Sequence, residues 1–261
     1  MQVIDRLLEY PTYRPEGVIN FTNNNWQIPF TAVSTYLAFC YFGKIYMKDR
    51  KPFNLKLSLA LWNSFLAVFS IAGAYITVPV ILRNYRSLPF ENTVCDRPHD
   101  TWASGTVGFW VMLFSLSKIP ELIDTVFIVL RKKPLIFLHW YHHATVMMYG
   151  WHAYSHLAAA GLYFVAMNYS VHAVMYTYYA LQAAGLCPRW FPSYIITISQ
   201  ILQMAVGTYV CVYTWYYMLQ GKTCYNDLSG MIYGALMYIS YFALFVNFAI
   251  QRFVLKKKKT Q

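Results

Sequence analysis

Seven long stretches of predominantly apolar residues follow one another along the chain, separated by short polar or proline-containing segments. They cover approximately residues 28–47, 57–82, 107–130, 135–154, 159–183, 190–219 and 228–254. A helix that crosses the hydrocarbon core of a bilayer needs about 20 such residues at a rise of about 1.5 Å each. The pattern predicts an all-α, polytopic membrane protein whose seven transmembrane helices belong to a single domain.

Composition agrees with a membrane location. Hydrophobic residues make up 58% of the chain and charged residues only 12%, whereas soluble domains contain about 45–50% and about 25%. Aromatic residues reach 19%, and tyrosine and tryptophan are favoured at membrane–water interfaces. The net charge of +11 is distributed in short clusters between the apolar stretches. This arrangement favours a membrane surface and anionic substrates over nucleic acid.

Lysine and arginine are distributed unevenly between the two sides of the predicted bundle. With the C-terminus in the cytosol, fourteen of the 21 fall in cytosolic segments and six on the opposite side. The positive-inside rule then predicts a lumenal segment over residues 1–27 and a cytosolic tail over 255–261. Cys95 and Cys224 both fall in lumenal loops, where disulfides form and persist, and we predict a bridge between them.

The third stretch contains several ionisable residues, which are costly in a bilayer and therefore candidates for function. Lys118, Glu121 and Thr125 share one face of a helix. Asp124 lies at the rim of that face. Pro120 lies among them and predicts a kink, because it cannot donate the backbone hydrogen bond of a regular helix. The structural alternative is an ion pair that holds two helices together.

Polar residues in the next three stretches extend this pattern. His139, His142 and His143 occupy positions i, i+3 and i+4, so that their imidazoles lie on one face of a helix. The following two stretches add Asn168, His172, Thr197, Gln200 and Gln203. Counted by helical rise, the polar positions of the four stretches lie about 6–20 Å from the cytosolic end. They predict one site, open to the cytosol.

The predicted mouth of this site is basic. Arg131, Lys132 and Lys133 lie between the two most polar stretches, and such residues suit a phosphate-rich ligand. The alternative is the ordinary positive-inside signal. The lumenal halves of the stretches are apolar and aromatic, which suits an acyl chain. The ligand is therefore expected to have an anionic head and an apolar tail.

Four motifs resemble those of the ELO family of very-long-chain fatty acid elongases. In family order they are Lys118-x-x-Glu121-x-x-Asp124-Thr125, His139-x-x-His142-His143, His172-x-x-Met175-Tyr176-x-Tyr178-Tyr179 and Thr197-x-x-Gln200-x-x-Gln203. The residues around 137–143 and 167–172 are most similar to the animal branch acting on long-chain saturated and monounsaturated acyl-CoAs. Lys258 and Lys259 resemble a di-lysine retrieval signal of the endoplasmic reticulum membrane.

The resemblance implies condensation of a fatty acyl-CoA with malonyl-CoA to 3-ketoacyl-CoA, carbon dioxide and CoA, in an acyl-CoA tunnel open to the cytosol. It implies no cofactor and no metal. In the preferred mechanism His142 attacks the acyl thioester; a one-step condensation with histidine as base is the competitor. The predicted catalytic residues are His139, His142, His143 and His172, and the predicted substrate-binding residues are Lys118, Asp124, Arg131, Lys133, Asn168, Tyr178, Thr197 and Gln200.

Two other classes of function stay open at this point. A histidine box also serves di-iron desaturases and hydroxylases, although those enzymes need about eight histidine ligands and this chain has seven histidines. A lipid transporter would carry polar residues through to the lumenal side, where these motifs stop. Membrane lipids, other enzymes of the elongation cycle and a second copy of the chain are candidate partners, and no nucleic acid is expected.

Overall fold

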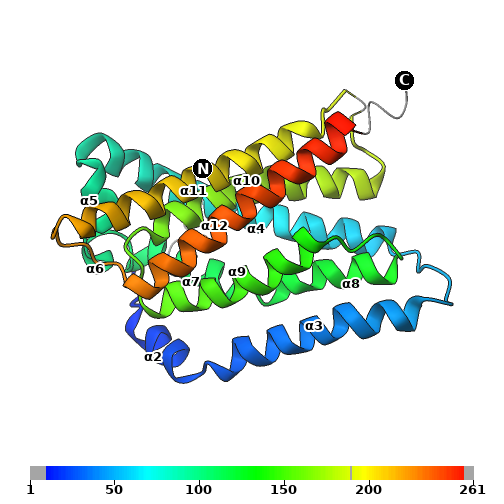
Figure 1. The fold of residues 1–261 in the computed structure, drawn as a ribbon, viewed down its shortest axis with the longest axis horizontal. Helices are drawn as coiled ribbons and strands as arrows, with labels where there is room; N and C mark the ends of the chain where they lie inside the picture. The colour runs from blue at the N-terminus through cyan, green and yellow to red at the C-terminus, as the bar shows by residue number, and fades with distance from the viewer. Residues whose placement is uncertain (1–9, 189, 256–261) are drawn as a thin grey trace.

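The computed structural model describes residues 10–188 and 190–255, and all regular structure in them is helical (Figure 1). The elements in chain order are α2 (Glu16–Asn24), α3 (Gln27–Met47), α4 (Lys56–Ser87), α5 (Phe90–Cys95), α6 (Pro98–Thr101), α7 (Gly105–Ser117), η1 (Pro120–Leu122), α8 (Ile123–Leu130), α9 (Phe137–Ser155), α10 (Gly161–Ala184), α11 (Tyr194–Leu219), α12 (Leu228–Ala249) and η2 (Ile250–Leu255). The predicted all-α class is confirmed.

Helices occupy all seven of the apolar stretches, and consecutive long helices run in opposite directions (Figure 1). The third stretch is interrupted as Pro120 predicted: α7 ends, a single 3-10 turn follows, and α8 begins at Ile123. The sixth stretch was placed too early. Its helix starts at Tyr194 instead of residue 190, because the residue before Pro192 is disfavoured in the helical conformation.

Six helices form a closed ring of contacts. Contacts join α4 to α10, α10 to α11, α11 to α12, α12 to α9, α9 to α7, and α7 back to α4. The remaining long helix, α3, packs against α8 and α9 from outside this ring. We call the end of the bundle that carries α5 and α6 the disulfide end, and the opposite end, which carries the α8–α9 and α10–α11 connections, the tail end (Figure 1).

The outer surface of the bundle is apolar. Along α4, the side chains of Leu57, Leu61, Phe65 and Val68 are each at least 60% exposed, and a soluble monomer does not leave such a stripe in water. By length and composition three helical segments are able to cross a membrane: α4, α11 and 228–255. Helices α7 and α8 have only 13 and 8 residues. The structure is that of an all-helical membrane protein.

Inside the bundle, α4 and α10 approach closely at Gly73. A Cβ atom at this position would lie 2.4 Å from Cζ of Tyr169. The Tyr169 side chain is buried, and its hydroxyl donates a hydrogen bond of 3.0 Å to the Trp110 carbonyl on α7. The absence of a side chain at Gly73 therefore allows one aromatic residue to connect three helices.

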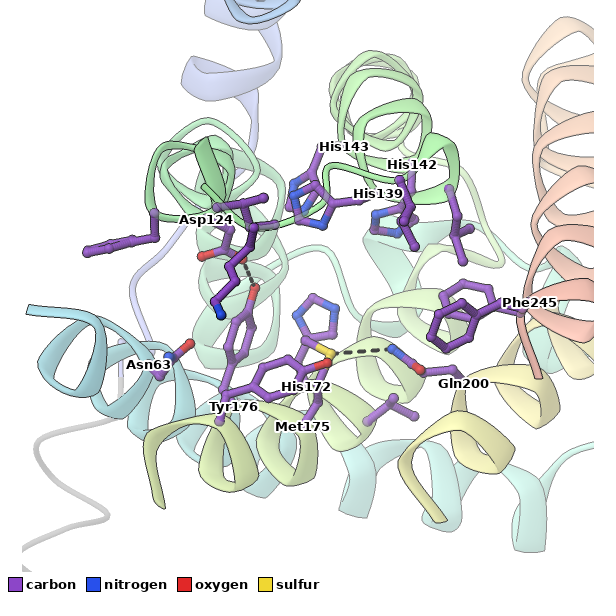
Figure 2. Close-up of a pocket in the computed structure, with 18 of the residues that line it drawn as sticks. Asn63, Asp124, His139, His142, His143, His172, Met175, Tyr176, Gln200 and Phe245 are labelled. Carbon is purple, nitrogen blue, oxygen red and sulfur yellow. Dashed lines mark hydrogen bonds between the residues drawn. The ribbon is translucent and has the colours of Figure 1, made fainter. Parts of the chain in front are cut away.

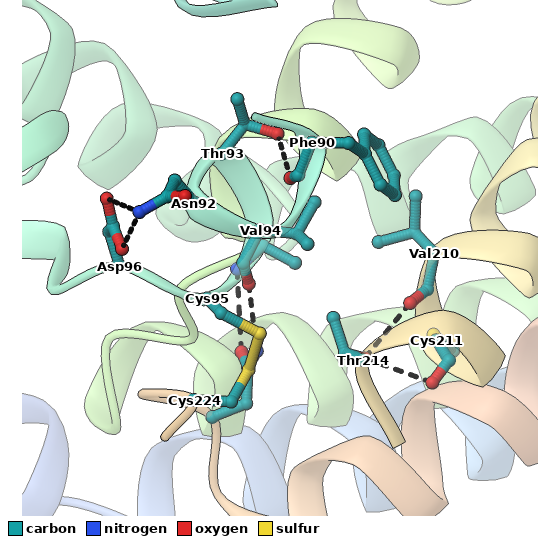
Figure 3. Close-up of a disulfide and its surroundings, with 12 residues drawn as sticks. Phe90, Asn92, Thr93, Val94, Cys95, Asp96, Val210, Cys211, Thr214 and Cys224 are labelled. Carbon is teal, nitrogen blue, oxygen red and sulfur yellow. Dashed lines mark hydrogen bonds between the residues drawn. A yellow bond between two sulfur atoms is a disulfide. The ribbon is translucent and has the colours of Figure 1, made fainter. Parts of the chain in front are cut away.

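A disulfide between Cys95 and Cys224 attaches α5 to the α11–α12 connection (Figure 3). These are the two cysteines that the sequence analysis paired. The Tyr225 amide donates to the Cys95 carbonyl at 2.9 Å, and the Asn226 side-chain amide donates to the Val94 carbonyl at 3.0 Å. The connection is thus held by backbone and side-chain contacts as well as by the covalent bond.

Directly after this connection, the Asp227 carboxylate caps the N-terminus of α12. It accepts hydrogen bonds from the Ser229 hydroxyl and from the Gly230 amide, the latter at 2.8 Å. These hydrogen bonds, that from Ser229 first, lower the pKa of the Asp227 carboxyl. The cap satisfies one of the four free amides at the start of the helix.

Replacing Gly73 with alanine should destabilise the protein by about 1–3 kcal/mol, because the new methyl group must displace the Tyr169 ring from a packed interior. Thermal unfolding in detergent measures the effect. The matched control is Gly17→Ala in α2, where a Cβ atom would meet nothing within 4 Å. This control should be neutral or stabilising by up to about 1 kcal/mol. Equal unfolding temperatures for Gly73→Ala and the wild type would contradict the packing argument.

Cys95→Ser and Cys224→Ser should each destabilise the protein by about 2–5 kcal/mol, since the bond closes a segment of 129 residues. The double variant should be no less stable than either single one, because both changes remove the same bond. Unfolding temperature and gel mobility with and without reductant provide the measurements. Cys187→Ser, which alters a free thiol, is the control. Alkylation of both thiols in the native protein would rule the bond out.

Candidate functional site

A cavity of about 560 Å³ lies inside the helix bundle. It reaches the tail end, because Arg131 and Lys133 in the α8–α9 connection line its wall. Side chains from α4, α8, α9, α10, α11 and α12 contribute the remainder (Figure 2). The cavity therefore lies where the polar faces of several helices meet.

Most of the residues predicted from the motifs line this one cavity. Those present in its wall are Asp124, Arg131, Lys133, His139, His142, His143, Asn168, His172 and Gln200. Three predicted residues, Lys118, Tyr178 and Thr197, lie behind the wall or beside it. Helices separated by up to 76 positions in the sequence thus place their polar residues in one space, as the depth argument required.

The first turns of α9 carry the histidine row. His139 forms a hydrogen bond of 2.9 Å through Nε2 with the hydroxyl of Thr125 on α8. The same hydroxyl lies 2.9 Å from the phenol oxygen of Tyr36 on α3. The rings of His139 and His143 are 4.4 Å apart between centroids. His139 is therefore engaged in holding α3, α8 and α9 together.

His142 differs from its neighbours in its surroundings. Within residues 10–188 and 190–255, neither nitrogen of its ring has a hydrogen-bond partner. The ring lines the main cavity and also a second cavity of about 60 Å³ that extends towards the disulfide end. Tyr241 packs against it, with ring centroids 4.9 Å apart, and donates a hydrogen bond of 3.2 Å to the His142 carbonyl. His142 is thus positioned, unpaired, where the two cavities meet.

A chain of hydrogen bonds leads from α7 to His172. The Lys118 ammonium donates to both carboxylate oxygens of Glu121, at 2.7 and 2.9 Å, and to Oδ1 of Asn168 at 3.2 Å. The Asn168 amide in turn lies 3.1 Å from Nε2 of His172. Lys118 and Glu121 are almost fully buried, at 3% and 4% exposure. The ammonium therefore reaches the cavity only through Asn168.

Asp124 stands at the wall of the cavity near its α4 side. Its carboxylate accepts a hydrogen bond from the Trp62 indole at 2.6 Å. It accepts a second from the Tyr176 hydroxyl at 2.7 Å (Figure 2). Asn63, next to Trp62, also lines the cavity and was not singled out from the sequence. Its signal was a single amide within an otherwise mostly apolar stretch.

Some polar residues of α10 and α11 line the cavity, and others lie outside its wall. Gln200 points its amide at the sulfur of Met175, 3.3 Å away (Figure 2). Thr197 is buried outside the cavity wall. The Tyr178 hydroxyl accepts a hydrogen bond of 3.0 Å from Gln182, which lines the cavity in its place.

Taken together, the cavity offers imidazoles, hydrogen-bond donors and a basic opening. An imidazole without a partner can act as a nucleophile or a general base. Donors that are fixed in a space with little water can stabilise a developing oxyanion. Guanidinium and ammonium groups at the opening suit phosphate. This combination fits acyl transfer from a phosphate-bearing carrier.

Comparison with known proteins agrees with the motifs. Residues 21–261 match the GNS1/SUR4 family, also designated ELO. The chain is 43% identical to very long chain fatty acid elongase 6 of Gallus gallus, over 95% of this chain and 93% of the relative. The protein of the same name from Homo sapiens is 42% identical over 95% and 92%, and that from Drosophila melanogaster is 42% identical over 86% and 71%. The predicted resemblance to the animal branch is confirmed.

The buried ion pair between Lys118 and Glu121 leads to a prediction about stability. Lys118→Met leaves the Glu121 carboxylate buried without its partner and should cost about 3–5 kcal/mol. The double variant Lys118→Met/Glu121→Leu should recover most of this loss, because it removes both charges. Unfolding of the three proteins in the same detergent gives the comparison. Equal stabilities of the single and double variants would show that Lys118 and Glu121 do not form the buried ion pair seen in the structure.

Proposed function

We propose that the protein condenses a long-chain fatty acyl-CoA with malonyl-CoA, because the chain belongs to the ELO (GNS1/SUR4) family of fatty acid elongases. The products are 3-ketoacyl-CoA, carbon dioxide and free CoA. The observation that carries the proposal is His142, unpaired at the junction of a polar cavity with a basic opening and a narrower apolar cavity. No cofactor is required, since both substrates are thioesters that react directly.

In the first half-reaction, a ring nitrogen of His142 attacks the thioester carbonyl. The acyl–sulfur bond breaks, the N–H proton of the imidazole passes to the departing CoA thiolate, and a neutral acyl-imidazole remains. Malonyl-CoA then loses carbon dioxide, and the resulting enolate attacks the acyl carbon. The acyl–nitrogen bond breaks, and His142 takes up a proton from water as it is released. His142 is the candidate among the histidines because Thr125 engages His139 and Asn168 engages His172.

His172 is suited to stabilise the oxyanions of both steps. Donation from the Asn168 amide to Nε2 leaves Nδ1 as the protonated nitrogen, an assignment that follows from the hydrogen-bond network. Nδ1–H is then available as a donor in the cavity. Lys118 holds Asn168 in this orientation and acts as a positioning residue. This replaces the direct contact with substrate expected for Lys118 from the motif.

The two ends of the substrate have separate surroundings. Arg131 and Lys133 at the opening suit the phosphates of CoA. The second cavity, with Met204, Phe164 and Tyr238 in its wall, suits the acyl chain. At about 60 Å³, it must widen when a chain enters, and methionine side chains adapt readily to such changes. This pair of cavities is our proposal for the acyl-CoA tunnel.

The two ends of the bundle also indicate the orientation in the membrane. The disulfide end carries Cys95–Cys224, which suits an oxidising lumen, and the tail end carries the basic α8–α9 connection. We propose one domain of seven spans in the endoplasmic reticulum membrane, with residues 1–27 on the lumenal side and the C-terminus in the cytosol. The predicted retrieval signal at Lys258 and Lys259 lies outside the described residues.

The alternatives receive no support from the relatives or from the positions of the histidines. His152 and His156 lie at the disulfide end, apart from the four cavity histidines. A di-iron site of about eight ligands would need both groups together. The relatives described above are all named as fatty acid elongases, and none is named as a transporter.

The function is tested with purified protein, malonyl-CoA and a panel of acyl-CoAs of different length and unsaturation. Release of carbon dioxide and formation of 3-ketoacyl-CoA should both depend on the acyl-CoA, with saturated and monounsaturated long chains preferred. The matched control is His99→Ala, which changes a histidine in α6 outside the cavity. Absence of 3-ketoacyl-CoA with every acyl-CoA of the panel would overturn the proposal.

Incubation with acyl-CoA alone should release one CoA per protein and leave the acyl group on His142. His142→Ala should abolish this release, whereas His172→Ala should slow it by about 10²–10³-fold, the effect of losing one oxyanion donor. Rapid quenching and peptide mass spectrometry locate the acyl group. Release of CoA only in the presence of malonyl-CoA, or an acyl group on another residue, would move His142 to the role of general base.

A further inference from the structure

We propose that His152, His156 and Asp227 bind a divalent transition metal of the zinc type at the disulfide end of the bundle. His152 lies in the last turn of α9, His156 directly follows that helix, and Asp227 precedes α12. One potential ligand atom of each residue lies within 4.8 Å of the other two. Among the described residues this is the one group of three histidine, cysteine or carboxylate ligands with such spacing.

The His152 imidazole is left without a hydrogen bond at a buried nitrogen. Its Nε2 atom lies 3.3 Å from Oδ2 of Asp227, but within the described part of the chain it has no partner in hydrogen-bonding geometry. A buried polar atom of this kind is uncommon and calls for an unseen partner. Because Nε2 faces a carboxylate, a cation between the two would give this nitrogen a partner and would be neutralised in part by Asp227.

His156 is oriented as metal-binding histidines usually are. Its Nδ1 lies 3.0 Å from the His152 carbonyl, so the ring donates its proton there and leaves Nε2 free as a ligand. Metal-ligating histidines almost always donate their second nitrogen in this way, which fixes the tautomer and raises the basicity of the ligating nitrogen. The i, i+4 spacing of the two histidines places both rings on one side of α9.

The space between the ligands suits one ion. A cavity of about 20 Å³ is lined by all three residues, and a volume of about 10–15 Å³ already accommodates a particle of the size of water. Gly230 in α12 contributes to this space, because a Cβ atom there would lie 3.0 Å from Nε2 of His152. A side chain at position 230 would close the approach between the imidazole and α12.

Ligand chemistry selects the metal. Two imidazoles and one carboxylate are ligands of zinc and its neighbours, whereas calcium and magnesium prefer oxygen ligands alone. Zinc bonds of about 2.0–2.1 Å in a tetrahedron place ligand atoms about 3.3 Å apart, and the His152–Asp227 separation already has this value. The exposed His156 side chain provides the third ligand, within 4.8 Å of the other two, and the fourth position of a tetrahedral site would be left for water.

Such a site would connect two helices that both reach the active-site cavity. Helix α9 carries His142, and α12 carries Phe245 in the cavity wall. A metal bound to both would stabilise the folded bundle by an amount that grows with its free concentration. This inference is independent of the proposed condensation reaction.

The test uses full-length protein purified in detergent without a polyhistidine tag and stripped with a chelator. Titration with zinc chloride against a chromophoric competitor should show one saturable site and a rise in the thermal midpoint, while magnesium and calcium should give neither. His156→Ala and Asp227→Asn should each weaken zinc binding at least about tenfold. Asp227→Asn is informative because asparagine caps a helix as well as aspartate does, so that α12 keeps its start.

Two control variants separate this site from the other imidazoles. His99→Ala and His142→Ala should both bind zinc with the affinity of the wild type. Wild-type affinity in His156→Ala and Asp227→Asn would overturn the proposal, as would the absence of saturable binding. Loss of zinc binding in His142→Ala alone would assign the metal to the cavity instead.

Discussion

The structure depends on one constraint: polar groups inside a membrane bundle must find their partners on other helices. The Lys118 ammonium illustrates it. At 3% exposure it can reach neither water nor lipid headgroups, and an unpaired charge in this position would cost several kcal/mol. Glu121 and Asn168 provide its partners, and through them α7 is attached to α10. The same hydrogen bonds orient His172, so the requirement for stability and the arrangement of the candidate active site are inseparable.

The break at Pro120 extends this network to the outer helix. Because α7 stops and α8 restarts after a 3-10 turn, Asp124 and Thr125 lie on a helix of their own. Asp124 then accepts hydrogen bonds from α4 and α10, while Thr125 connects α3 and α9. A short helix with two polar side chains therefore holds four neighbours, which explains how a polar cavity persists within an apolar bundle.

The two ends of the bundle are organised differently. At the disulfide end, the covalent bond, the capped start of α12 and the contact of His152 with Asp227 keep the helix ends together. At the tail end the cavity opens beside the charged α8–α9 connection. A bundle that is held firmly at one end and open at the other can admit a long substrate with its acyl chain first and still retain its packing. In the proposed reaction, this asymmetry separates the CoA-binding opening from the space for the acyl chain.

Much of this organisation could be predicted from the sequence. Hydropathy indicated where the helices lie, Pro120 indicated the break, and the spacing of His139, His142 and His143 indicated a shared face. These features are local, since each depends on residues within about two turns. The pairing of Cys95 with Cys224 was also foreseen, from loops that fall on the same side. The start of α11 was placed wrongly, because apolar character continues through the prolines that precede it.

Only the tertiary structure decided how the helices are rotated and which side chains meet. Contacts between distant segments form the closed ring of six helices and place Lys118 behind Asn168. Such contacts also place Asn63 in the cavity wall and bring His152 next to Asp227. Hydropathy determines the length and depth of a span. It does not determine how the helix is rotated about its axis, because the lipid-facing side and the packed interior are equally apolar. Rotation is instead decided by close approaches such as Gly73 on Tyr169 and by the pairing of buried polar groups, and both need the partner helix in place.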